Sequence, residues 1–149
     1  MHFTKSLTIS ATTLLLLGGA APAVASASTV DLSDQAPSSG SVTLDNNDQV
    51  KSASSSTLLA EITKATQNTG KIVVRSVVNM ASGRWVYYSD HHGLKNYKWG
   101  HSNYYSTKGR HGSKAKVGSS SSGWIYAKAH KYSYATAKGY GTFKAYYTN

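Results

Sequence analysis

Polar and apolar side chains alternate through the second half of the chain. Between residues 83 and 149 the alternation has a period of two, which is typical of strands with one buried and one solvated face. It is clearest over residues 85–88, 97–101, 114–117, 124–130 and 143–147. Turn-forming residues separate these runs at 90–93, 108–112, 119–123 and 139–141. Short strands at this spacing predict an all-β fold, either a small sandwich or a barrel.

The start of the chain has a different pattern, with a mostly apolar run from Leu7 to Leu17. Lys5 precedes this run, and small residues follow it in the triplets Ala23-Val24-Ala25 and Ala25-Ser26-Ala27, as in a secretory signal peptide. The run is shorter than the about 20 residues that a membrane-spanning helix needs. We therefore predict a signal peptide over residues 1–27 and a secreted, extracellular protein.

Residues 28–82 separate this signal from the alternating region, and we interpret them as a pro-segment or spacer. Residues 28–56 are rich in Ser, Asn, Asp and Thr, a composition that predicts disorder. Apolar residues at helical spacing behind a run of serines predict a short helix over residues 57–66. The Val- and Ile-rich stretch 71–80 predicts a strand, which belongs either to the pro-segment or to the domain that follows.

Charge divides the chain in the same place. Residues 28–70 hold five acids and two lysines, a balance of 2 − 5 = −3, which suits either an acidic pro-segment that neutralises a basic domain or a solvated spacer, the commoner case. Residues 83–149 hold 11 Lys or Arg and one acid, a balance of 11 − 1 = +10, with all 11 tyrosines and all three tryptophans. Cations interleaved with rings predict a surface for an anionic partner that has a flat or apolar part.

The core of residues 83–149 must be aromatic, because aliphatic residues are few there: Val86, Leu94, Val117 and Ile125. The chain has no cysteine, so no disulfide can stabilise it. We therefore expect a core of Tyr, Trp, Phe143 and alanines.

Enzymatic chemistry is hard to build from this block. Glycoside hydrolysis usually needs two carboxylates, and Asp90 is the only acid present. A cysteine nucleophile is absent, and no G-x-S-x-G motif accompanies the neighbouring Asp90 and His91. We predict that the protein is not an enzyme and has no catalytic residues. A histidine-based ribonuclease needs only two imidazoles and a cation, so it stays open as an alternative.

Five histidines of the block could in principle gather around zinc, but no ligand spacing supports a site. We predict no metal and no cofactor. Nucleic-acid binding fits the charge and the rings generically, yet no binding motif is visible and export weighs against it, so nucleic acid is not an expected partner. A membrane-active antimicrobial protein is a further alternative, although no basic amphipathic helix is present.

Several short motifs follow one another through residues 83–149 in an order that resembles the lactococcin 972 family of bacteriocins. They are Gly83-Arg84-Trp85-x-Tyr87, Ser102-Asn103-Tyr104-Tyr105, His111-Gly112-Ser113 followed by residues 114–117, Trp124-x-x-Ala127-x-Ala129 and Ala145-Tyr146-Tyr147. The family pattern places the mature domain close behind the signal, whereas 55 residues, 28–82, intervene here.

The resemblance implies a secreted antibacterial protein with a small antiparallel β-sandwich at the C-terminus. It implies inhibition of Gram-positive bacteria through lipid II, the lipid-linked cell-wall precursor, and a block of septum formation. The partners expected on this basis are lipid II or another anionic envelope component, a homodimer partner, and an immunity or export protein. A pyrophosphate and sugars suit cations and rings, and their capture needs no nucleophile.

The candidate target-binding residues come from the motifs and from the polar face of one predicted strand. They are Trp85, Tyr104, Tyr105, His111, Lys114, Lys116 and Trp124. For the rings the commoner role is core packing, since a small domain with few aliphatics needs them there. For the two lysines the commoner role is a solvated face.

Overall fold

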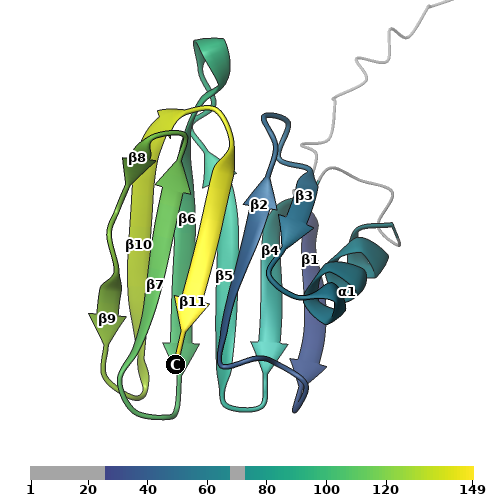
Figure 1. Ribbon diagram of the computed structural model, residues 1–149, viewed down its shortest axis with the longest axis vertical. Coiled ribbons are helices and arrows are strands. Elements are labelled where there is room, and N and C mark those ends of the chain that lie inside the picture. Colours follow the sequence, from purple (N-terminus) through teal and green to yellow (C-terminus); the bar gives the residue numbers. More distant parts are fainter. Residues whose placement is uncertain (1–25, 68–72) are drawn as a thin grey trace, which may run out of the picture.

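The computed structural model describes residues 26–67 and 73–149, which form two β-sheets and one helix (Figure 1). The predicted signal peptide therefore lies almost entirely outside the described residues. The strands are β1 (Ser26–Ser33), β2 (Ser39–Leu44), β3 (Val50–Ala53), β4 (Val73–Met80), β5 (Gly83–Asp90), β6 (Tyr97–Ser106), β7 (His111–Val117), β8 (Ser120–Ser121), β9 (Ile125–Ala127), β10 (Lys131–Tyr140) and β11 (Phe143–Thr148). Helix α1 spans Ser56–Gln67, and a 3-10 turn, η1, spans Leu94–Asn96.

The strands form a two-layer β-sandwich. Sheet A has the order β1-β4-β5-β6-β10, and sheet B has the order β3-β2-β11-β7-β8, with β9 also paired to β7. The β1–β4 pair is parallel, and the other strand pairs of the described ranges are antiparallel. Buried side chains of both sheets meet in one core, so the predicted sandwich is confirmed and the barrel is not formed.

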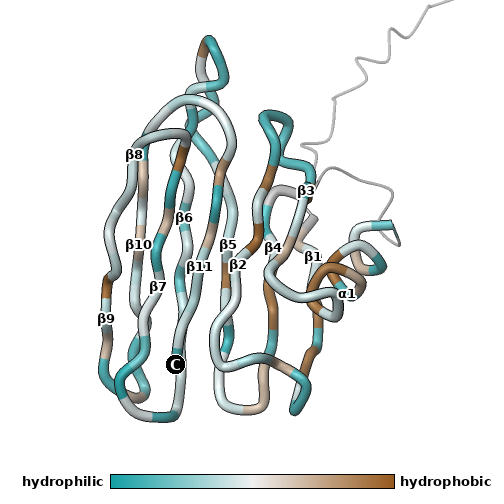
Figure 2. The backbone as a smooth tube through the Cα atoms, viewed as in Figure 1, coloured by the Kyte–Doolittle hydropathy of each residue, from teal (hydrophilic) through white to brown (hydrophobic). Residues whose placement is uncertain are grey.

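The core contains the expected rings and alanines together with an aliphatic part that was not expected. Trp85, Tyr87, Tyr104, Phe143 and Tyr147 are buried, as are four alanines of β7, β10 and β11. Residues 28–82 add eight buried aliphatic side chains, Val30, Leu32, Val42, Leu44, Leu58, Ile62, Val77 and Val78. In Figure 2 the most hydrophobic segments lie mainly on α1 and the strands beside it.

The prediction of disorder over residues 28–56 is wrong. Strands β1, β2 and β3 occupy most of this stretch, and each has a partner in one of the sheets. In β2 the residues Gly40, Val42 and Leu44 are buried and alternate with more exposed residues. This period-two pattern was concealed because glycine, which has no apolar side chain, occupies one of the three inward positions of this short strand.

The sandwich also extends across the predicted boundary at Gly83. Strand β4 pairs with β5, and β2 pairs with β11 near the other end of the chain. The strand predicted over 71–80 is confirmed over residues 73–80 as β4, which belongs to the same sheet as β5 and β6; residues 71–72 lie outside the described ranges. Residues 28–67 and 73–82 are thus a structural part of the sandwich and not a spacer beside it.

A buried lysine joins the two parts of the chain. The side chain of Lys98 in β6 has no solvent exposure, and its Nζ lies 2.5 Å from Oδ1 of Asp48. The same Nζ donates to the carbonyl oxygens of Asp45 and Asn46, each at 3.1 Å. The turn between β2 and β3 therefore provides the partners of a charge in β6.

Helix α1 confirms the helix predicted over residues 57–66. The Ser55 hydroxyl accepts a hydrogen bond from the Leu58 amide at 3.1 Å, which caps the first turn. Leu58 and Ile62, four residues apart, are buried on one face of the helix. The helix packs at the sandwich edge near β1 and β3 (Figure 1). No helix among the described residues is long and apolar enough to cross a membrane.

Candidate functional site

The seven candidate residues from the sequence fall into two groups. Trp85, Tyr104 and His111 are buried in the sandwich. The other four have solvent-accessible side chains and lie on different faces: Tyr105 on the outer face of sheet A, and Lys114, Lys116 and Trp124 on the outer side of sheet B. The structure therefore brings only three of the seven together on one surface.

The buried group packs the core. Trp85 lies with its ring centroid 4.7 Å from that of Tyr87 and 4.8 Å from that of Tyr147, and its Nε1 donates to the Ser102 hydroxyl at 2.9 Å. Tyr104 and His111 meet edge to face at 5.4 Å. With at most 1% exposure, Trp85, Tyr104 and His111 have no surface to offer a target while the protein is folded.

The surface group belongs to a larger patch, which we call the cationic face: Arg110, Lys114, Lys116, Trp124, Tyr126, Lys144 and Tyr146. Its centre is the antiparallel pair β7–β11, where Lys116 is directly opposite Lys144 and Lys114 is directly opposite Tyr146. Outward positions alternate with buried alanine, valine and tyrosine on both strands, so the lysines share one side of the sheet.

The two opposed lysines, Lys116 and Lys144, are expected to lower the stability of the sheet. Like charges directly opposite each other on neighbouring strands destabilise a sheet. Every ion pair within residues 26–67 and 73–149 involves Asp48 or Asp90, and Lys98 is the only Lys or Arg in one. Lys114, Lys116 and Lys144 therefore have no neutralising carboxylate there, and a bound anion would supply the missing negative charge.

Aromatic rings border these cations. The Lys114 and Lys144 Nζ atoms lie 5.5 and 5.8 Å from the centroid of Tyr146. The Trp124 ring is 6.2 Å from both Tyr146 and Tyr126, and the Arg110 guanidinium lies 4.1 Å above Tyr126. Trp124 and Tyr126 are 40% and 47% exposed, so they offer flat apolar area beside the charges.

Glycine at position 112 lets this aromatic border form. A Cβ at Gly112 would come within 2.8 Å of the Tyr126 ring, which lies across the strand at that point. Strand β9 pairs with β7 through Tyr126 and Gly112. A side chain at this position would displace Tyr126 and the guanidinium above it.

Arg110, Tyr126, Lys144 and Tyr146 were missed as candidates by sequence reasoning. The alternation of residues 143–147 was visible, and it placed Lys144 and Tyr146 on a common strand face. The missing information was the register of β11 against β7, which brings Lys144 opposite Lys116. That register depends on two strands separated by about thirty residues, so it cannot be predicted from the sequence of either strand alone.

A second cluster of polar groups lies on the outer face of sheet A. Oδ1 of Asp90 is 2.7 Å from Nδ1 of His91 and 3.0 Å from Nε2 of His101. His91 stacks on Trp99 at 4.0 Å between centroids, and the Lys138 Nζ is 3.6 Å from the same ring. Among the described residues no set of His, Asp and Glu is placed to hold a metal ion.

Opposing influences act on the Asp90 carboxyl. Partial burial would raise its pKa, but hydrogen bonds from His91 and His101 and the favourable charge of both imidazoles lower it, and the lowering prevails. The carboxylate is thus held ionised between two imidazoles.

Comparisons with known proteins found no matching family model, no similar curated protein and no similar solved structure.

Proposed function

We propose that the chain is a secreted antibacterial protein, a bacteriocin, that inhibits Gram-positive bacteria by binding lipid II and blocking septum formation. The observation that carries this proposal is the Lys116–Lys144 pair at the centre of the cationic face, which no carboxylate of the described residues neutralises. The order of motifs resembling the lactococcin 972 family supports the same target class. The expected site of contact is the cationic face.

The chemistry of the face suits a pyrophosphate attached to sugars. Lysines without acidic partners can make charge-assisted hydrogen bonds to phosphate oxygens, which are stronger than neutral ones. The half-exposed Trp124 and Tyr126 lie beside those lysines and can pack against the apolar face of a sugar ring. Binding of this kind requires no nucleophile, in agreement with the scarcity of carboxylates in residues 83–149.

The decisive experiment uses the secreted protein and a variant with Lys114, Lys116 and Lys144 changed to Gln. Pre-mixing the parent protein with purified lipid II should protect growing Gram-positive cells, and the variant should bind lipid II more than tenfold more weakly, since hydrogen bonds to charged groups contribute about 1.5–3 kcal/mol each. The matched control changes exposed Lys51, Lys64 and Lys95 to Gln, which removes the same charge elsewhere. Absence of protection by lipid II would refute the target.

Two further observations separate this mechanism from a membrane-active one. Treated cells should fail to divide without rapid leakage of their contents. Liposomes without lipid II should retain an entrapped dye at the same protein dose. Dye release from them would favour membrane disruption instead.

A ribonuclease-like activity is the second candidate, because Asp90, His91, His101 and Lys138 bring two imidazoles and a cation to one face of sheet A. Both imidazoles contact the same carboxylate oxygen, and His101 also contacts the Thr136 hydroxyl through Nδ1. Incubation with RNA at high protein concentration tests it. Intact RNA would eliminate this candidate, and cleavage abolished by His91→Ala would support it.

A further inference from the structure

The outer face of sheet A carries a row of tyrosines that the cationic face does not include. Tyr105 of β6 is directly opposite Tyr132 of β10, with 5.3 Å between ring centroids, and Tyr134 stacks on Tyr132 at 5.4 Å. We call Tyr105, Tyr132 and Tyr134 the tyrosine row. Arg84 of β5 is directly opposite Tyr105 on the other side, so it extends the row by a cation.

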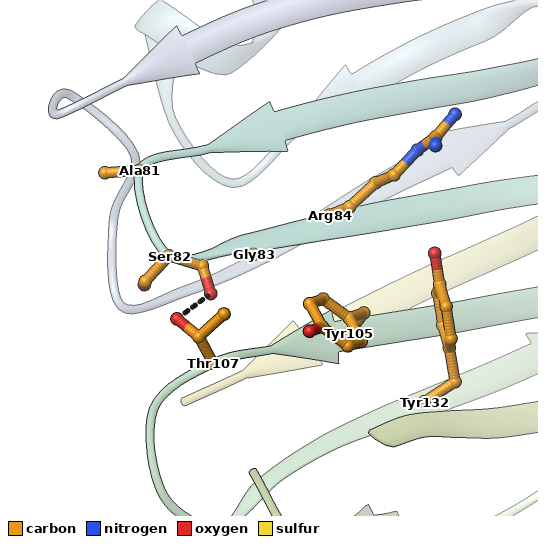
Figure 3. Close-up of a pocket in the computed structure, with 7 residues that line it drawn as sticks. All are labelled: Ala81, Ser82, Gly83, Arg84, Tyr105, Thr107 and Tyr132. Carbon is orange, nitrogen blue, oxygen red and sulfur yellow. Dashed lines mark hydrogen bonds between the residues drawn. The ribbon is translucent and has the colours of Figure 1, made fainter. Parts of the chain in front are cut away.

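A hollow lies at this end of the sheet. It has a volume of about 400 Å³ and is lined by Ser82, Gly83, Arg84, Tyr105, Thr107 and Tyr132 (Figure 3). The Thr107 hydroxyl donates to the Ser82 carbonyl at 3.1 Å and ties the strand ends together there. The hollow therefore combines ring faces, a guanidinium and hydroxyl groups on the end of a rigid sheet.

Folding does not explain the exposed end of the tyrosine row. Tyr134 is 65% exposed, so most of its ring contributes nothing to the core. Two other rings on the same face are covered by cations: Arg75 lies 4.7 Å from the Tyr88 centroid, and Lys138 lies 3.6 Å from that of Trp99. Within the described residues no cation lies over a ring of the row, and Arg84 takes part in no ion pair.

We propose that the tyrosine row and Arg84 bind a polysaccharide chain that contains carboxylated sugars. A sugar ring has an apolar C–H face that packs on an aromatic ring and a rim of hydroxyls that needs hydrogen-bond partners. The row offers successive ring faces, and the Thr107 hydroxyl lies at its end. Arg84 can hold a carboxylate with two parallel hydrogen bonds. This site is separate from the cationic face and does not depend on the function proposed for it.

The charge of the row distinguishes a polysaccharide from single-stranded nucleic acid. A nucleic-acid strand stacked on three rings carries about one phosphate per base, and proteins that bind it track the backbone with a positively charged groove. Here Arg84 is the cation directly beside the three rings. On the same face Arg75 and Lys138 lie over other rings, Tyr88 and Trp99, and Asp90 adds a carboxylate. A sparsely charged chain of sugars fits this ratio better than a phosphate at every unit.

Affinity electrophoresis of the secreted protein in gels that contain polygalacturonate or hyaluronan tests the proposal. The runs use about 0.15 M salt, where long-range attraction between exposed charges is largely screened. We expect retardation of the parent protein and about tenfold weaker binding by Tyr134→Ala, near the upper end of what one aromatic contact contributes. Tyr134→Phe should keep the parent affinity, because the ring remains.

The charged contact has its own test. Arg84→Gln should bind polygalacturonate no better than its methyl-esterified form, in which the backbone is unchanged and the carboxylates are neutral. The parent protein should prefer the carboxylated form. Equal binding of both forms by the parent would overturn the role of Arg84 and the acidic character of the ligand.

Two control variants test which face of the protein binds the polysaccharide. Tyr140→Ala removes a tyrosine of the same strand that is 62% exposed and outside the row, and it should bind like the parent. The Lys114, Lys116 and Lys144 variant should also bind like the parent. The proposal fails if neither polysaccharide retards the protein, or if those lysines and not Tyr134 are required. It also fails if the row binds poly(dT) more tightly than either polysaccharide.

Discussion

At the scale of single residues, Lys98 has the most demanding environment in the sandwich. Its ammonium group is fully buried and depends on the Asp48 carboxylate and two turn carbonyls. A buried ion pair adds little compared with an apolar replacement of both partners, but removal of one partner leaves a charge without compensation.

Truncation of this lysine should therefore be costly. We predict that Lys98→Ala lowers the free energy of unfolding by about 3–5 kcal/mol, measured by chemical denaturation. Lys95→Ala, which removes an exposed lysine three residues earlier, provides the control. If Lys98→Ala lowers the free energy of unfolding by less than the control does, the turn that carries Asp48 reorganises freely.

Asp90 makes the second prediction at this scale. Its folded-state pKa is lowered, so its contribution to stability is fully present above the ordinary carboxyl pKa of about 3.9 and is lost as the pH falls through the lower folded value. Asp90→Asn should lower the melting temperature slightly at pH 6 and have no effect at pH 2. The effect is small because solvent screens a side chain that is 38% exposed. An equal decrease in melting temperature at pH 6 and at pH 2 would show that the substitution acts through lost packing and not through lost charge.

At the scale of elements, the β7–β11 pair carries charges that favour the binding of an anion but lower the stability of the sheet. The opposed lysines Lys116 and Lys144 destabilise the pair, and a functional role for the charge would explain why both are present. This interpretation differs from that of a solvated face, because a solvated face would not require two cations in direct opposition.

We predict that Lys144→Glu raises the free energy of unfolding by about 0.2–1 kcal/mol, since it creates an ion pair with Lys116 across the strands. The same variant should bind lipid II more weakly. Thermal denaturation and a lipid II binding assay on one preparation measure both effects. If the variant is more stable but binds lipid II as well as the parent protein does, the cationic face is not the site that binds lipid II.

Strand prediction was most successful where rings and aliphatics alternate with cations, as in β5, β6, β7 and β11. It failed at β1 and β2, because their inward positions include serine and glycine, and at β3, in which no residue is fully buried. Ser28, for example, is buried in β1 and donates to the hydroxyl of Ser76 in β4. A buried hydroxyl is tolerated when a partner strand offers it a hydrogen bond. The local sequence does not show which strand that partner will be, so the buried serine cannot be predicted from it.

At the scale of the whole molecule, the described residues of the segment 28–82 complete both sheets. They contribute every buried leucine and isoleucine of the described chain, whereas Leu94 and Ile125 are on the surface. Three of the seven candidate residues proved to be core residues for a related reason, because large rings and these aliphatics share one interior. The division by charge near residue 83 was real in the sequence, but it did not coincide with a division in the fold.

Residues 83–149 alone should therefore not fold. Without the earlier segment, β5 and β11 become open edges and Lys98 loses its partners. We predict that circular dichroism and NMR spectra of the 83–149 fragment show an unfolded chain, while residues 26–149 give a folded one. The mass of the secreted species should include residues 28–82. Folded fragment 83–149, or a secreted species of that size, would contradict this.

The pairing of β2 with β11 also determines when the protein can fold as it is made. Ser39 pairs with Thr148, and the amide of Asn149 donates to the carbonyl of Ser38 at 2.8 Å. Contacts between such distant positions slow folding, because a long loop must close before they form. Sheet B stays incomplete until residue 148 has left the ribosome. The chain therefore cannot complete its native structure while it is being made, and a chain in that state is compatible with a translocation channel for unfolded chains.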